Sequence, residues 1–152
     1  MNTSTDRIER KILLKASLAR VWQALSTPRE FGDWFGVAFE STAFIPGQCA
    51  RGRITYPGYE HLIFEAWVER VEPQRLLSFR WHPNAVDSND YSGEPTTLVE
   101  FSLQPVEDGT LLTLVESGFD QVPPERRLTA FRSNSEGWDE QMKNIEKYVA
   151  SP

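Results

Sequence analysis

One charged residue, Glu116, stands where the sequence pattern predicts the protein interior. Leu112 and Leu114 alternate with polar neighbours in a predicted strand, and the same alternation turns Glu116 inward. A carboxylate removed from water must find hydrogen-bond or charged partners. The functional interpretation of Glu116 is a polar anchor or proton acceptor at the mouth of a cavity, and its pattern alone does not favour this over the structural interpretation. The alternative is a strand-end glutamate paired with a nearby arginine.

Other residue types that support catalysis are not arranged for it. The two histidines are expected at the surface, His61 beside a turn and His82 out of phase with Trp81. The chain has no nucleophile elbow, no glycine-rich phosphate loop and no metal-ligand spacing, and Cys49 is its single cysteine. The sequence predicts no catalytic residue, no cofactor and no metal.

Large apolar side chains accompany Glu116 in the predicted interior. Aromatic and aliphatic walls with a few polar groups are typical of small-molecule sites. The side chains expected to line a ligand-binding site, together with Glu116, are Trp34, Phe35, Phe64, Phe79, Trp81, Phe101, Leu114, Trp138 and Met142. The same side chains would also make a solid core, and the sequence leaves both interpretations open.

The N-terminal elements follow from hydrophobic spacing and helix boundaries. Apolar alternation predicts a first strand over residues 7–15. Ser17 is expected to cap a helix that ends before Pro28, since proline cannot continue a helix. A second short helix is predicted from Pro28 to Trp34, with proline in its first turn.

The rest of the chain is predicted to be a meander of strands closed by a helix. Turn residues recur at strand-length intervals across residues 37–117, which is typical of antiparallel strands. Alternation within them predicts inward rows, one of which is Leu62, Phe64, Ala66 and Val68. Residues 83–95 carry no periodicity and are predicted to be a long loop. Residues 123–131 are expected to form a turn or short helix, and a final helix is expected to start at Ser133 or Ser135. Its predicted inward stripe is Trp138, Met142, Ile145 and Val149.

Composition limits the classes of partner. The 152 residues are expected to form one domain, residues 1–152, with a net charge of −6 and a pI near 5.0. An acidic chain without clustered Lys and Arg argues against a nucleic-acid partner. The sequence has no stretch of about 20 apolar residues and no apolar leader, so we expect no membrane span and a cytoplasmic location.

The sequence resembles the family of Hsp90 ATPase activator homologues, a branch of the START-like or SRPBCC superfamily that includes polyketide cyclases and hydrophobic-ligand carriers. The order and spacing of several short motifs carry the resemblance over nearly the whole chain. These motifs are Ala16-Ser17, Val21-Trp22-Gln23-Ala24-Leu25-Ser26, Pro28, Trp34-Phe35, Val71-Glu72-Pro73-Gln74-Arg75-Leu76-Leu77-Ser78-Phe79-Arg80-Trp81, Gly109-Thr110, Leu112, Leu114, Glu116-Ser117-Gly118-Phe119 and Gly137-Trp138.

The resemblance implies an α+β class with a helix-grip fold, START-like or Bet v 1-like. In this fold a curved antiparallel sheet bends around a long C-terminal helix, with two short helices after the first strand. The element order read from the residues, β-α-α-β-β-β-β-β-β-α, agrees with that fold. In the superfamily the space between sheet and helix is often a ligand cavity.

Three functions remain open at the level of sequence. The leading hypothesis is non-catalytic binding of an apolar or aromatic small molecule between the sheet and the C-terminal helix. The second is a protein-interaction module related to Hsp90 co-chaperones, with a chaperone as partner. The third is a cyclase- or hydrolase-type enzyme, for which Glu116, Tyr56, Tyr59 and Ser117 are the available polar residues. An internal cavity of about 300 Å³ or more would support binding, and a filled interior would favour the interaction module.

Overall fold

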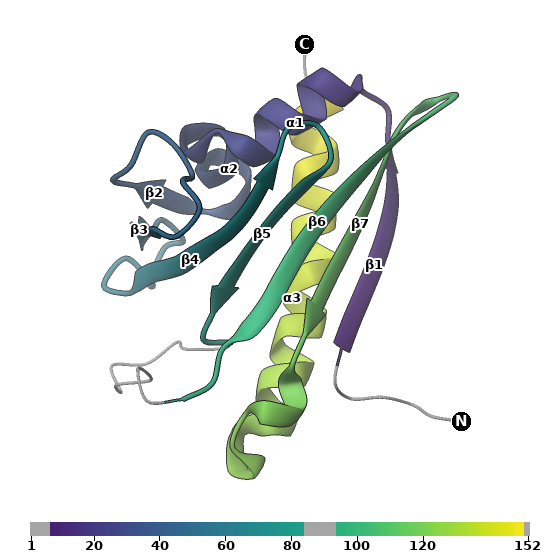
Figure 1. Ribbon diagram of the computed structural model, residues 1–152. Coiled ribbons are helices and arrows are strands. Elements are labelled where there is room, and N and C mark those ends of the chain that lie inside the picture. The colour runs from purple at the N-terminus through teal and green to yellow at the C-terminus, as the bar shows by residue number, and fades with distance from the viewer. Residues whose placement is uncertain (1–6, 84–93, 151–152) are drawn as a thin grey trace, which may run out of the picture.

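The computed structural model describes residues 7–83 and 94–150 and confirms the helix-grip fold. A curved antiparallel sheet has one face covered by a long helix, α3, and two short helices lie beside the upper end of α3 (Figure 1). The seven strands are β1 (Arg7–Leu14), β2 (Val37–Phe39), β3 (Cys49–Ile54), β4 (Ile63–Glu72), β5 (Leu76–Trp81), β6 (Thr97–Val106) and β7 (Gly109–Ser117). The helices are α1 (Leu18–Ser26), α2 (Pro28–Phe35), the 3₁₀ turn η1 (Phe119–Gln121) and α3 (Pro124–Ala150).

Strands β2 to β7 form a meander, and β1 pairs with β7 at one edge of the sheet. The strand order is β1-β7-β6-β5-β4-β3-β2, and all neighbouring strands are antiparallel. The inward rows read from the alternation are buried, for example Phe64, Ala66 and Val68 on β4. Because side chains on a strand point to alternate faces, one face of the sheet supplies the core that α1, α2 and α3 cover, although β5 is buried on both faces over residues 76–79.

The two short helices begin as the sequence predicts, and α2 ends one residue later than predicted, at Phe35. The side chain of Ser17 accepts a hydrogen bond from the Arg20 backbone N–H at 3.2 Å, which caps α1. Pro28 stands in the first turn of α2. Gly36 ends α2 in the left-handed region, with φ of 98°, which favours glycine.

The prediction for the start of the last helix was wrong. A single helix of 27 residues, α3, begins at Pro124, about ten residues before Ser133 or Ser135. One of the two serines predicted to start the helix makes a tertiary contact instead, since Ser135 Oγ accepts from Arg10 Nη2 at 2.7 Å. The predicted inward stripe is confirmed, since Trp138, Met142, Ile145 and Val149 are all buried.

The predicted loop over residues 83–95 lies largely outside the described residues, which stop at Pro83 and resume at Glu94. Both flanking positions are tied to the first turn of α3. Arg126 donates to the Pro83 carbonyl oxygen at 3.0 Å and to Glu94 Oε1 at 2.9 Å. The two ends of this connection are therefore fixed to the helix.

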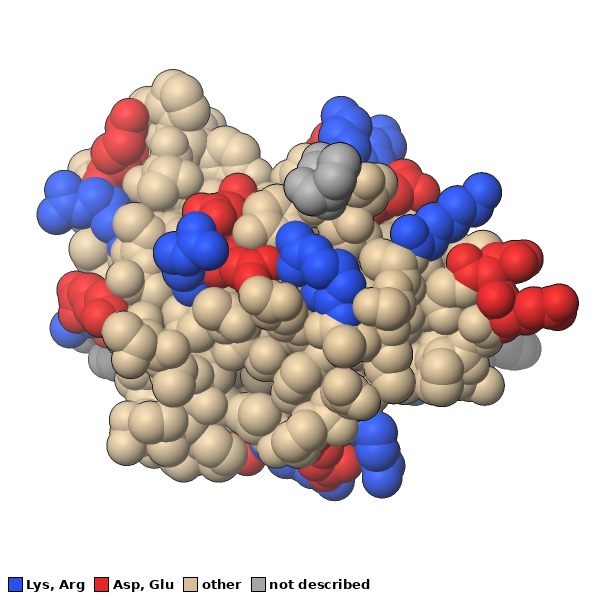
Figure 2. All heavy atoms as spheres, turned by 90° about the horizontal axis from the view of Figure 1, so that it is seen from above, with Lys and Arg blue, Asp and Glu red and all other residues tan. Residues whose placement is uncertain are grey.

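Surface charges are interspersed. Figure 2, the view from above, shows acidic and basic side chains in mixed groups beside a broad uncharged area, with no large basic patch on that face. On the outward face of the sheet, Arg51 pairs with Glu65 across β3 and β4 at 3.0 Å, and Arg80 pairs with Glu69. In the described part of the chain, no helix is both long enough and apolar enough to cross a membrane.

Two glycines in helices should respond to alanine in opposite ways. A Cβ on Gly137 in α3 would meet nothing within 4 Å, so Gly137→Ala should raise stability by about 1 kcal/mol and the melting temperature by about 2–4 °C. A Cβ on Gly32 in α2 would lie 2.0 Å from the Val37 carbonyl oxygen, so Gly32→Ala should destabilise by about 1–3 kcal/mol. Thermal melts of the two variants test this, and two shifts of the same sign would contradict it.

Candidate binding site

The ten predicted site residues lie in or against one buried cluster beneath α2 and α3. Nine are buried, and Trp81, at the end of β5, is half-buried. Strands supply six of them, α2 supplies two and α3 supplies two. They are Trp34, Phe35, Phe64, Phe79, Trp81, Phe101, Leu114, Glu116, Trp138 and Met142.

Aromatic rings join the two helices to the sheet. Phe35 on α2 has its ring centroid 6.0 Å from Trp138 and 6.1 Å from Trp81. Trp81 and Trp138 stack at 5.8 Å with 30° between their planes. Phe64 lies edge-on to Trp81 at 5.6 Å. Offset and edge-on pairs of this kind are favourable beyond the area that they bury.

Glu116 lies at the polar end of this cluster and is fully buried. Its Oε1 accepts from Trp138 Nε1 at 2.8 Å and from Asn134 Nδ2 at 2.9 Å. Its Oε2 accepts from Thr97 Oγ1 at 2.6 Å, from Trp81 Nε1 at 2.7 Å and from Asn134 Nδ2 at 3.0 Å. Every partner is an uncharged donor, and the two indole N–H groups can only donate.

The secondary structure brings these donors together from distant parts of the sequence. Glu116 is near the end of β7 and is opposite Val99 of β6, so the start of β6 delivers Thr97 and the end of β5 delivers Trp81. Asn134 and Trp138 are four residues apart on α3 and so lie on the same face of the helix. Sequence reasoning found both tryptophans but missed Thr97 and Asn134, because short polar residues carry no hydrophobic signal.

The alternative of an arginine-paired surface glutamate is wrong. Glu116 is buried, and within residues 7–83 and 94–150 it takes part in no ion pair. Arg10, on the neighbouring strand β1, bonds to α3 instead, to Ser135 Oγ and to Asp139, each at 2.7 Å. The carboxylate is satisfied by dipoles alone, which is how a charge can be buried without a counter-ion.

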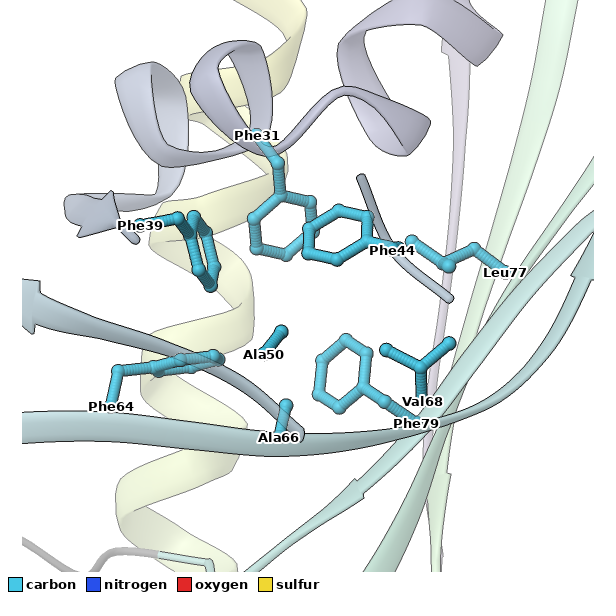
Figure 3. A pocket seen from close by; sticks show the side chains of 9 residues that line it. All are labelled: Phe31, Phe39, Phe44, Ala50, Phe64, Ala66, Val68, Leu77 and Phe79. Carbon is cyan, nitrogen blue, oxygen red and sulfur yellow. The ribbon is translucent and has the colours of Figure 1, made fainter. Parts of the chain in front are cut away.

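A second feature of the interior is a small apolar void between α2 and strands β3 to β5 (Figure 3). Its volume is about 10 Å³, and its walls are the side chains of Phe31, Phe39, Phe44, Ala50, Phe64, Ala66, Val68, Leu77 and Phe79. A space of this size is at the limit for one water molecule and far below the 300 Å³ or more of a typical ligand site. In this conformation the described interior is filled.

Seven of the nine residues that line the void were not predicted to be site residues. Phe64 and Phe79 were the two predicted site residues that line it, while Ala66 and Val68 were expected as core in the same inward row. Phe39 is the last residue of β2, and Phe44 follows that strand. β2 has only three residues, which are too few to show an alternating hydrophobic pattern. The sequence feature that could have indicated this lining is the density of phenylalanines from Phe31 to Phe44. Four phenylalanines in fourteen residues are expected to be buried together in the core.

The remaining polar candidates lie away from this interior. Tyr56 and Tyr59 are 44% and 55% exposed, His61 is exposed, and Ser117 is half-buried. In the described ranges, no group of three or more His, Cys, Asp and Glu side chains is arranged to hold a metal ion. Partial burial raises the pKa of the Cys49 thiol, so it is a weak nucleophile near neutral pH.

Comparisons with known proteins agree with the fold. A family model described as Activator of Hsp90 ATPase homolog 1-like protein matches residues 15–150. No curated protein matches the chain.

Solved structures share the fold at low sequence identity. Protein MLL2253 from Mesorhizobium loti is 20% identical, with a TM-score of 0.72 over 95% of this chain and 96% of its own. Protein Ms6760 from Mycobacterium smegmatis is 16% identical, with a TM-score of 0.74 over 99% and 94%. DynU16, a protein in the dynemicin biosynthetic locus, is 23% identical, with a TM-score of 0.74 over 96% of this chain and 48% of its own.

Proposed function

Because the chain belongs to the family of activator of Hsp90 ATPase homolog 1-like proteins, we propose that it binds an apolar or aromatic small molecule between its sheet and helices, without converting it. The observation that carries the proposal is the void beneath α2, whose walls are entirely apolar. Apolar cavities of about 150 Å³ stay dry and take up benzene, so this void of about 10 Å³ must enlarge before a molecule of that size can enter. The void marks where packing is incomplete and where a ligand would displace the least.

Of the side chains that line the void, those of Phe39 and Phe44 beside β2 should move at the lowest cost in free energy. Phe39 and Phe44 are half-buried, whereas Phe31, Phe64 and Phe79 are buried. β2 is the last strand of the sheet and has only three residues, and residues 40–48 form no helix or strand. Turning these two rings outward would enlarge the space with little disturbance of the core.

The predicted site residues extend the proposed ligand path from the void to Glu116. Phe64 and Phe79 line the void, and both rings also lie next to Trp81, at 5.6 and 5.5 Å. Trp81 in turn donates to Glu116. A ligand that fills the void and reaches this carboxylate would have an apolar body and one polar end.

Three variants test the proposal with a panel of fatty acids, flavonoids and small aromatic compounds. Phe44→Ala removes a ring from the void wall and should increase affinity for an indole-sized compound by about tenfold or more, as a vacated apolar site accepts the ligand. Ala66→Ile fills the void and should abolish binding. Ala38→Ile on β2 adds the same side chain at an exposed position and serves as the matched control.

Tryptophan fluorescence and NMR shift mapping give the readouts, with Trp81 and Trp138 as reporters. We expect saturable binding with shifts at the void lining and at these two indoles. If neither the wild type nor Phe44→Ala binds any member of the panel saturably, the proposal fails. Equal loss of binding in Ala66→Ile and Ala38→Ile would also count against the void as the site.

The filled interior favours a second candidate, a protein-interaction module related to Hsp90 co-chaperones. A void of about 10 Å³ is what a domain would have if its interior served only packing. The test is the ATPase rate of purified Hsp90 with and without the chain, beside a direct pull-down. Stimulation of the ATPase together with an absence of small-molecule binding would favour this function over the first.

A further inference from the structure

We propose that Glu116 binds the ammonium group of an organic amine, and that the side-chain amide of Asn134 occupies the ammonium position when no ligand is bound. The inference rests on the proposed function, because it places the ligand in the same interior. It deepens that function by naming the ligand class, a primary amine on an apolar or aromatic body. Its two structural supports are the missing counter-ion and the position of the Asn134 nitrogen.

Within the described residues, the carboxylate of Glu116 forms no ion pair. All sixteen Lys and Arg residues and both His residues of the chain lie in the described ranges, and none of them forms an ion pair with Glu116. Trp81, Thr97, Asn134 and Trp138 supply only neutral dipoles. In a low-dielectric interior, an ion pair with additional hydrogen bonds is much stronger than a dipole alone. A ligand cation would therefore gain more here than a neutral hydroxyl would.

The Asn134 nitrogen stands where an ammonium nitrogen would bridge both oxygens. Asn134 Nδ2 is 2.9 Å from Oε1 and 3.0 Å from Oε2 of Glu116. Charge-assisted N–H···O contacts have lengths of about 2.7–2.9 Å, so an ammonium fits the same point with a small shift. Displacing the amide leaves the carboxylate with three of its donors, and the ammonium replaces the fourth.

Of the four residues that donate to Glu116, Asn134 can turn its side chain away with the least disturbance of its neighbours. Thr97 and Trp138 are buried, and Trp81 is packed against Phe64, Phe79 and Trp138. Asn134 is half-buried on α3, and its side-chain amide donates to Glu116. A change in its side-chain torsion would expose the carboxylate without moving a strand or an aromatic ring.

The surroundings suit the rest of such a ligand. The rings of Phe35, Trp81 and Trp138 have centroids 5.8–6.1 Å apart around the carboxylate end of the cluster. Aromatic rings attract an organic cation within about 6 Å and pack against an apolar body. The net charge of −6 favours the approach of cations over anions.

The test compares benzylammonium with benzyl alcohol, which has nearly the same shape but no charge. Both compounds are titrated at pH 7 and constant ionic strength into the full-length wild type, Asn134→Ala and Asn144→Ala. Asn144 is a half-buried asparagine on the same helix that donates to Gln141, so it is the matched control. Affinity is measured by tryptophan fluorescence, and the shift in melting temperature gives an independent readout.

We expect Asn134→Ala to bind benzylammonium at least tenfold more tightly than benzyl alcohol, and more tightly than the wild type does. Asn144→Ala should behave as the wild type. In the double variant Asn134→Ala/Glu116→Gln, the preference for the amine over the alcohol should disappear, since the carboxamide at position 116 carries no charge. If this double variant does not fold, the amine-to-alcohol ratio in Asn134→Ala still decides.

Equal affinity for the amine and the alcohol in Asn134→Ala overturns the inference but leaves the proposed function standing. No binding of either compound by Asn134→Ala also overturns it, while the Phe44→Ala experiment decides the proposed function separately. A preference for the amine that survives Glu116→Gln would place the cation elsewhere and would equally refute the assignment.

Discussion

Glu116→Gln should lower the melting temperature by about 5–20 °C, equivalent to roughly 2–5 kcal/mol, although the two side chains have nearly the same shape. Glu116 accepts from two indole N–H groups, one on each carboxylate oxygen. A carboxamide has one oxygen and one NH₂ group, so whichever way it turns, the NH₂ faces an indole that can only donate. One buried donor is left without a partner, and the remaining hydrogen bonds lose their charge assistance.

Glu65→Gln is the matched control for this prediction. Glu65 is on the outward face of β4 and pairs with Arg51 in water, so the same substitution should change stability by less than about 1 kcal/mol. Thermal and urea melts of both variants measure the difference. Similar small shifts for the two glutamates would mean that the hydrogen bonds to Glu116 contribute little to stability.

Deleting all residues from Ser135 onward should abolish cooperative folding. This segment contains four of the five buried residues of α3, namely Trp138, Met142, Ile145 and Val149. Its loss would strip the cover from Phe101 and Leu114, which are both fully buried, and would remove a donor of Glu116. The exposed apolar face would be larger than a soluble monomer tolerates, so aggregation should follow. Circular dichroism during heating provides the measurement, and an intact cooperative melt would refute the prediction.

Two point variants separate lost packing from lost chain length. Ile145 is fully buried, and Ile145→Ala should cost about 2–5 kcal/mol. Lys143 lies two residues earlier on the exposed face, and Lys143→Ala should stay within about 0.5 kcal/mol of the wild type. Equal effects at both positions would mean that α3 is held by something other than its apolar face.

The fold was largely predictable because it depends on hydrophobic period, which is local in the sequence. Strand alternation identified the inward row of Phe64, Ala66 and Val68, and helical spacing identified the stripe of α3. The start of α3 was not predictable in this way, because Ser135 has the residue type of a cap but accepts a hydrogen bond from Arg10 inside the helix. A polar residue inside a helix reads as a boundary unless its tertiary partner is known.

The candidate site was predictable in part. The inward orientation of Glu116 followed from alternation, and both tryptophans that donate to it were expected in the interior. That the two indoles turn their N–H groups onto one carboxylate depends on side-chain orientation, which residue type does not give. The small volume of the void likewise depends on how large side chains interlock, and composition gives only their number.

The pairing of the first strand with the last strand has a consequence for the order of folding. β1 pairs with β7 in a register that joins Arg7 to Ser117 and Leu14 to Thr110, about a hundred residues apart. Closing so long a loop is entropically costly, and contacts of high sequence separation slow folding. On the ribosome, β1 would leave the exit tunnel long before its partner strand is made. The meander from β3 to β7 can form first, and β1 then joins its edge in a late step as α3 closes over the sheet.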